Sequence, residues 1–155
     1  MQTRLWKLVV GTLAVSVALW AADPILGTWK LNLEKSKYGA RPAPKSSTAT
    51  FAAQEGGMIK YTADSIDDKS QATHTEWSAK LDGKEYPVTG SPTGDTVVGK
   101  QISARTIEWT VKKEHKIVVT GKSVISKDGK TLTTVWSGTD EKGQTQSWTA
   151  VSDKQ

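Results

Sequence analysis

The sequence predicts an all-β protein: an antiparallel up-and-down β-barrel of about 8–10 strands, preceded by a cleavable signal peptide. Short segments in which apolar and polar residues alternate are separated by turn-forming pairs such as Asp82-Gly83 and Asp128-Gly129. No segment after the leader carries a sustained helical period. Because nearly every connection is short, consecutive strands should pair antiparallel, and closing the sheet removes the exposed edges that an open meander would leave.

Residues 1–21 have the pattern of an export signal. Arg4 and Lys7 form a charged start, and an uncharged apolar run, Leu8–Ala22, ends in two small residues of the kind that signal peptidases cut after. The run is shorter than the roughly 20 apolar residues of a membrane span, so a retained N-terminal anchor is the less favoured alternative. We therefore expect residues 22–155 to form one domain that is exported, periplasmic or extracellular, and has no stable membrane span after cleavage.

The first strand is expected at residues 27–32, where Trp29 alternates with polar neighbours. In residues 33–46, Pro42 and Pro44 prevent regular structure, so this segment should form a long loop over the mouth of the barrel. Valine, isoleucine, threonine and tryptophan dominate the remaining segments, as suits a half-buried sheet. Nine further strands are expected at residues 47–54, 58–65, 72–81, 84–89, 95–101, 105–112, 115–125, 131–138 and 144–151.

Composition narrows the classes of function. The chain has no cysteine, which excludes disulfides, a thiol nucleophile and cysteine metal sites. The net charge of +5 includes Arg4 and Lys7 of the leader, and the other basic residues are spread beside acidic ones, so we expect no nucleic-acid partner. No phosphate loop, calcium loop or serine elbow is present, so we expect no cofactor and no metal.

The inward faces of the strands carry large rings flanked by alanine, serine and threonine. A core packed to crystalline density would use more leucine and isoleucine, so this mixture indicates a cavity with room for a guest molecule. Taken singly, each ring could instead be ordinary core. Arg105 is the candidate cation for a ligand carboxylate. The predicted ligand-binding residues are Trp29, Phe51, Tyr61, Trp77, Trp109, Trp136 and Trp148.

The motif Gly27-x-Trp29 after a leader, followed by the strand meander and by the segments Asp128–Leu132 and Gly143–Thr145, resembles the calycins, meaning lipocalins and fatty-acid-binding proteins. The resemblance implies that Trp29 closes the barrel floor and that a late basic side chain, here Lys154, stacks over it. The chain departs from the fatty-acid-binding proteins because residues 144–151 hold no Arg-x-Tyr, so that mechanism of fatty-acid binding is not expected.

These observations favour an exported, non-enzymatic protein that binds a small hydrophobic or amphiphilic molecule inside the barrel. One alternative is an envelope or carbohydrate-contacting module in which some tryptophans face outward as stacking platforms. The other is a barrel enzyme that uses His74 and Glu76, which share one face of a strand. That face also holds Ser78 and Lys80, which indicates a solvated surface.

Overall fold

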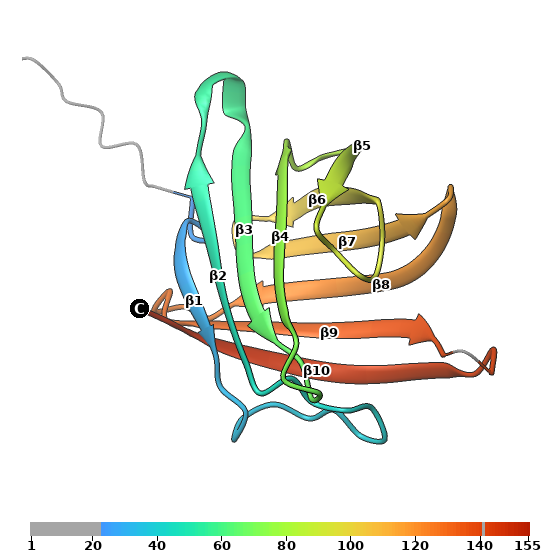
Figure 1. The fold of residues 1–155 in the computed structure, drawn as a ribbon. Helices are drawn as coiled ribbons and strands as arrows, with labels where there is room; N and C mark the ends of the chain where they lie inside the picture. Colours follow the sequence, from blue (N-terminus) through green and yellow to red (C-terminus); the bar gives the residue numbers. More distant parts are fainter. Residues whose placement is uncertain (1–22, 141) are drawn as a thin grey trace, which may run out of the picture.

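The computed structural model of the protein describes residues 23–140 and 142–155; the expected signal peptide at residues 1–21 lies outside this range. Ten antiparallel strands close into one barrel, as the sequence predicts (Figure 1). The ends of the strands differ from the expected ones by a few residues. The strands are β1 Gly27–Leu31, β2 Ser46–Ala53, β3 Ile59–Ile66, β4 Ala72–Ala79, β5 Asp82–Thr89, β6 Thr96–Ser103, β7 Thr106–Lys113, β8 Lys116–Ile125, β9 Thr131–Thr139 and β10 Thr145–Lys154.

Helical structure in the described residues is limited to η1 (Glu55–Gly57), a single 3-10 turn between β2 and β3. Nothing there has the length and apolar character of a helix that crosses a bilayer.

Each strand pairs with its neighbours in sequence, and β1 also pairs with β10, which closes the barrel. Trp29 lies opposite Lys154 on β10 and opposite Ala49 on β2. The seam between β4 and β5 is the shortest, with two register pairs. Strands β1–β4 cross β6–β10 steeply in Figure 1, so the barrel is flattened between two curved walls.

The two ends of the barrel differ. We call the end where β1 begins the floor, and the end where β1 runs into the loop 32–45 the mouth (Figure 1). Ile25, Trp29, Ile107 and Ile125 close the floor, each at most 1% exposed. Their burial anchors the core at this end of the molecule.

Trp29 occupies the floor position implied by the calycin resemblance. Its indole nitrogen donates a hydrogen bond to the Ile25 carbonyl at 2.7 Å, and Lys154 Nζ lies 5.1 Å from its ring centroid. Gly27 has φ +128°, and a Cβ there would lie 2.7 Å from Lys154 Cε. The glycine of the motif is therefore required by its backbone conformation, while the Lys154 side chain lies close over it.

The loop 32–45 is fastened to the middle of β10. Lys37 and Thr149 exchange backbone hydrogen bonds of 2.8 and 2.7 Å, and Val151 N donates to Ser36 Oγ at 2.9 Å. Farther along the loop, Arg41 N donates to the Tyr38 carbonyl at 3.1 Å, which forms a turn. The loop is thus held across one side of the mouth, although it contains no helix.

Candidate functional site

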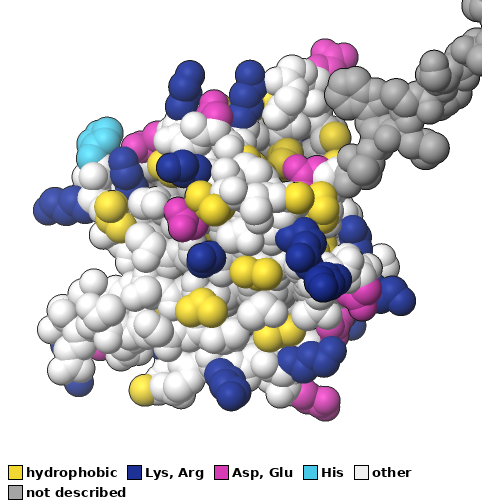
Figure 2. Space-filling view, turned by 180° about the vertical axis from the view of Figure 1, so that it is seen from behind, with side chains coloured by type: hydrophobic (Ala, Val, Ile, Leu, Met, Phe, Trp, Pro, Cys, Tyr) yellow, Lys and Arg dark blue, Asp and Glu magenta, His cyan; other side chains and the backbone are white. Residues whose placement is uncertain are grey.

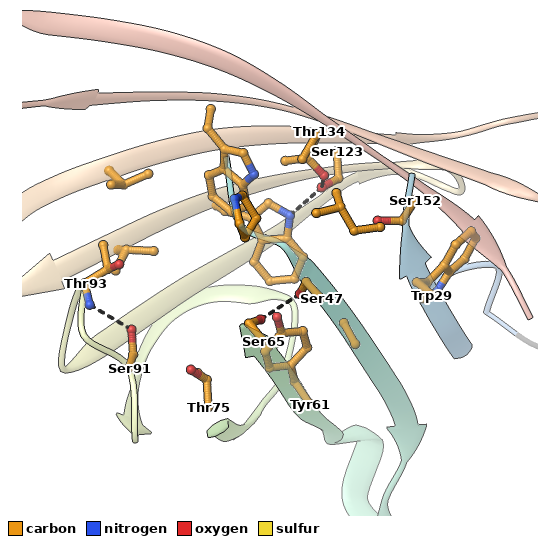
Figure 3. A pocket seen from close by; sticks show the side chains of 18 of the residues that line it. Trp29, Ser47, Tyr61, Ser65, Thr75, Ser91, Thr93, Ser123, Thr134 and Ser152 are labelled. Carbon is orange, nitrogen blue, oxygen red and sulfur yellow. Dashed lines mark hydrogen bonds between the residues drawn. The ribbon is translucent and has the colours of Figure 1, made fainter. Parts of the chain in front are cut away.

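The barrel encloses a cavity of about 380 Å³. It runs from Trp29 at the floor to residues of the mouth loops, and Figure 3 shows its lining side chains converging from the two walls. All seven residues proposed from the sequence line it: Trp29, Phe51, Tyr61, Trp77, Trp109, Trp136 and Trp148. The five tryptophans of the described chain therefore face the interior, which disfavours the alternative with outward stacking platforms.

Four of these rings form one aromatic cluster in the depth of the barrel. Phe51, Tyr61 and Trp77 are direct cross-strand neighbours on β2, β3 and β4. Tyr61 stacks on Trp77 with centroids 4.8 Å apart and an interplanar angle of 12°, and Trp109 reaches Trp77 from β7 at 5.7 Å. The cluster joins the two walls of the barrel and gives the cavity an apolar inner part.

Besides Trp29 at the floor, the remaining two rings form a separate pair nearer the mouth. Trp136 and Trp148 are cross-strand neighbours on β9 and β10, half-buried, with centroids 6.4 Å apart and planes 22° apart. They lie in the same row of the sheet as Gly121 on β8. This pair extends the apolar surface toward solvent.

Strand glycines give the tryptophans their space. A Cβ on Gly121 would lie 2.3 Å from Trp136 Cε3, and a Cβ on Gly99 would lie 2.9 Å from Trp109 Cζ3. Sequence analysis missed these two positions, although an isolated glycine within a strand is a known signal of close approach. Their bare α-carbons allow the rings to lie flat on the neighbouring strand.

A buried hydroxyl chain orients Trp109. Its indole nitrogen donates to Ser123 Oγ at 2.9 Å, and Ser123 Oγ lies 2.7 Å from Thr134 Oγ1 (Figure 3). Ser123 is 3% exposed and Thr134 7%. Because each polar atom has a partner, the chain fixes the ring without leaving a buried group unsatisfied. The sequence alone did not single out Ser123, because nothing near it in the chain indicates its partners.

Further hydroxyls line the opposite wall. Ser47 and Ser65 are hydrogen-bonded at 2.8 Å across β2 and β3, and Thr75 on β4 lies near them in Figure 3. Tyr61 also lies inside the barrel, where burial raises its pKa to about 12, so its hydroxyl stays neutral at physiological pH. The surface that Tyr61 retains faces the cavity. The site therefore offers neutral donors and acceptors beside its apolar rings.

Among the described residues that line the cavity, the one with a charged side chain is Arg41, which was not selected from the sequence. Its guanidinium carbon lies 3.9 Å from the centroid of a Trp148 ring, and the residue lines the cavity. The sequence-based choice, Arg105, was wrong: its Nη1 donates to the Ile125 carbonyl at 3.4 Å in the turn before β7. That turn lies at the floor, outside the cavity.

His74 and Glu76 lie on the outer face of β4, away from the cavity. His74 Nδ1 is 2.7 Å from Asp64 Oδ1 and Nε2 is 3.8 Å from Glu76 Oε1, while Lys60 pairs with Glu76 at 2.9 Å. The Asp64 hydrogen bond raises the pKa of His74, and the Lys60 hydrogen bond lowers that of Glu76. With the His74 side chain 53% exposed, this is a solvated charge network.

The rest of the outer surface is mixed. On the face in Figure 2, basic side chains are interspersed with acidic and hydrophobic ones. No group of three or more histidine or acidic residues in the described ranges is arranged to hold a metal ion.

Comparison with known proteins identifies the architecture. A scan of protein-family models and a search of curated proteins each found no match. Among solved structures, the crystal structure of Rv2717c from M. tuberculosis is similar over 90% of this chain and 98% of that chain, with a TM-score of 0.56 and 17% identity. This likeness shows the fold alone.

Two further structures match less well. They are EF1p2_mFAP2b and the redesigned β-barrel mFAP1, both bound to DFHBI. Each is 11% identical to this chain and covers 87% of it. For EF1p2_mFAP2b the match covers 97% of its own chain with a TM-score of 0.45, and for mFAP1 it covers 98% with a TM-score of 0.43.

Proposed function

We propose that the protein is an exported, non-enzymatic binding protein that holds a small hydrophobic or amphiphilic molecule inside its barrel. The observation that carries the proposal is the cavity of about 380 Å³, into which seven large rings converge from separate strands. Ligand pockets in proteins commonly measure about 300–1,000 Å³ and combine apolar walls with a few polar groups.

Burial of apolar surface would supply most of the affinity, at about 25 cal/mol per Å² removed from water. The Phe51, Tyr61, Trp77 and Trp109 cluster offers such surface in the depth of the cavity. The hydroxyls of Ser47, Ser65 and Thr75 would orient the polar atoms of the ligand.

The non-enzymatic part of the proposal is supported by the chemistry of the lining. Among the described residues, those that line the cavity include neither a carboxylate nor an imidazole, so they present no acid–base pair to a bound molecule. The histidine and acidic side chains considered from the sequence, His74 and Glu76, are on the opposite side of the β4 backbone.

Export is proposed from the leader sequence, with its charged start and apolar run. Expression of the full chain in a bacterial host and mass spectrometry of the exported fraction test it. We expect a mature chain that begins at or near residue 22. A chain that keeps residues 1–21 and stays with the membrane would contradict this part of the proposal.

A cavity-filling pair of variants tests ligand binding. Ala49 lines the cavity, whereas Ala52 is exposed on the outer face of the same strand, β2. Purified wild type should bind retinoids or fluorescent fatty acids with quenching of tryptophan emission. Ala49→Phe should lose most of this binding, because the new ring occupies the cavity, and Ala52→Phe should keep it.

Circular dichroism of the three proteins controls for folding. The proposal fails if no apolar probe binds the wild type, or if Ala49→Phe and Ala52→Phe bind equally well while folded.

A further inference from the structure

Arg41 stands out among the residues that line the cavity. The other described lining residues are aromatic, aliphatic, hydroxyl-bearing or proline, so Arg41 supplies the charge of this surface. It comes from the loop 32–45 and lies at the mouth, while the aromatic cluster around Trp77 lies deeper. The cavity is therefore asymmetric along its length, with a cation at the open end and apolar rings below.

The guanidinium is held on a stack of flat groups. It lies 3.9 Å from the Trp148 ring centroid, Trp148 stacks on Trp136, and Trp136 packs against the α-carbon of Gly121. The loop that carries Arg41 is fixed to β10 through Lys37. The position of the guanidinium is therefore set by its cation–π contact with Trp148 and by the backbone hydrogen bonds of its loop, and not by an acidic partner.

The charge of Arg41 is not neutralised within the described chain. The ion pairs there involve Lys35, Lys60, His74 and Lys112, and each lies on the outer surface. The nearest polar groups that the cavity offers are neutral hydroxyls. A ligand anion at the mouth would therefore meet an unpaired cation beside an apolar wall, where its charge is screened less than in bulk water.

We propose that Arg41 binds the anionic head group of an amphiphilic ligand whose apolar body lies in the cavity. This assignment rests on the proposed function and names the class of ligand. The guanidinium carbon lies over the Trp148 ring, an arrangement that would leave the N–H groups at the edge of the guanidinium for a ligand. A guanidinium binds the two oxygens of a carboxylate or sulfonate side by side, which a lysine ammonium does not.

Two dyes with the same aromatic body provide the test. Anilinonaphthalene sulfonate carries an anionic group, and phenylnaphthylamine lacks it. Both are titrated against the wild type, Arg41→Gln and Arg105→Gln. Arg105→Gln is the matched control, because it removes the same charge at the floor, outside the cavity.

We expect Arg41→Gln to weaken binding of the sulfonate dye about tenfold or more, since a hydrogen bond to a charged group is lost. Binding of the neutral dye should change less than about threefold, and Arg105→Gln should leave both affinities near the wild type. Dodecanoate should displace the neutral dye from the wild type better than dodecanol does, and this preference should disappear in Arg41→Gln.

The outcomes separate the two levels of the proposal. If neither dye binds the folded wild type, the cavity is not a binding site and the assignment of Arg41 falls with it. If both dyes bind but Arg41→Gln weakens them equally, or weakens neither, the anion site is refuted while the binding function stands. Circular dichroism of each variant confirms that it is folded.

Discussion

The ring of Trp136 lies against the bare α-carbon of Gly121, so closely that a methyl group there would sit 2.3 Å from Cε3. This contact sets the position of Trp136, on which Trp148 stacks in turn. The absence of a side chain at Gly121 on β8 thus determines the shape of the cavity wall near the mouth.

Gly121→Ala should displace Trp136 and destabilise the protein by about 1–3 kcal/mol, because the methyl group overpacks the contact. Urea unfolding followed by circular dichroism measures the change. In a Trp136→Leu background the same alanine should cost much less, since the ring that it strikes is absent. Equal costs in the two backgrounds would contradict the role given to this contact.

Ser123→Ala should cost about 1–3 kcal/mol, because it leaves the buried Trp109 indole N–H without its acceptor. Ser47→Ala is the control: Ser47 pairs with Ser65 in a less buried place, and we expect less than about 1 kcal/mol. Urea unfolding midpoints of the two variants and the wild type measure these losses of stability. A larger effect at Ser47 would show that Ser123 does not orient the ring.

Trp29→Ala should cost more stability than Trp148→Ala, whereas Trp148→Ala should act on the anion site at the mouth. Trp29 is 1% exposed at the floor, so its loss should cost about 3–5 kcal/mol. Trp148 is half-buried at the mouth, so truncation should cost roughly half as much but should release Arg41 from its ring platform. Thermal unfolding and dye titration are measured on both variants. A Trp148 variant that binds the sulfonate dye as well as the wild type would argue against the platform.

The pKa of His74 should lie above its ordinary value of 6.5, because its ring donates a hydrogen bond to Asp64. The folded protein then holds that proton more tightly than the unfolded chain does. The resulting stabilisation is complete below about pH 6.5 and is lost as the pH rises through the raised pKa.

Proton NMR titration of the His74 ring tests this shift. Asp64→Asn should lower the midpoint toward 6.5, whereas Asp68→Asn, in the exposed turn after β3, should change it little. An unchanged midpoint in Asp64→Asn would mean that another group holds the proton.

Local signals in the sequence were sufficient for the fold. The Asp128-Gly129 turn and the two-residue alternation predicted the ten strands closely, because hairpin geometry depends on neighbours in the chain. Asp82-Gly83, which was expected to be a turn between two strands, instead forms the start of β5. Trp29 was placed correctly at the floor because its motif starts the first strand. The same alternation brought the seven predicted rings to the cavity.

The parts that the sequence did not predict depend on contacts between distant segments. Arg41 belongs to a loop without periodicity, so nothing local indicates that it lies on Trp148. Arg105 was chosen without considering at which end of the barrel its strand begins. In an up-and-down barrel every odd-numbered strand starts at the same end as β1. Arg105 directly precedes β7, so it lies at the floor. The partners of Ser123 become visible only when β7, β8 and β9 lie side by side.

The pairing of β1 with β10 has a consequence for biosynthesis. Trp29 lies opposite Lys154, and Gln155 N donates to the Thr28 carbonyl at 2.9 Å. While the ribosome is still making the intervening hairpins, β1 has one free flank, and Trp29 lacks the lysine that covers it. Nascent chains that stop before β10 should therefore remain open and vulnerable to proteases. Closure of the barrel should be a late, slow step of folding, because β1 and β10 are far apart in the sequence.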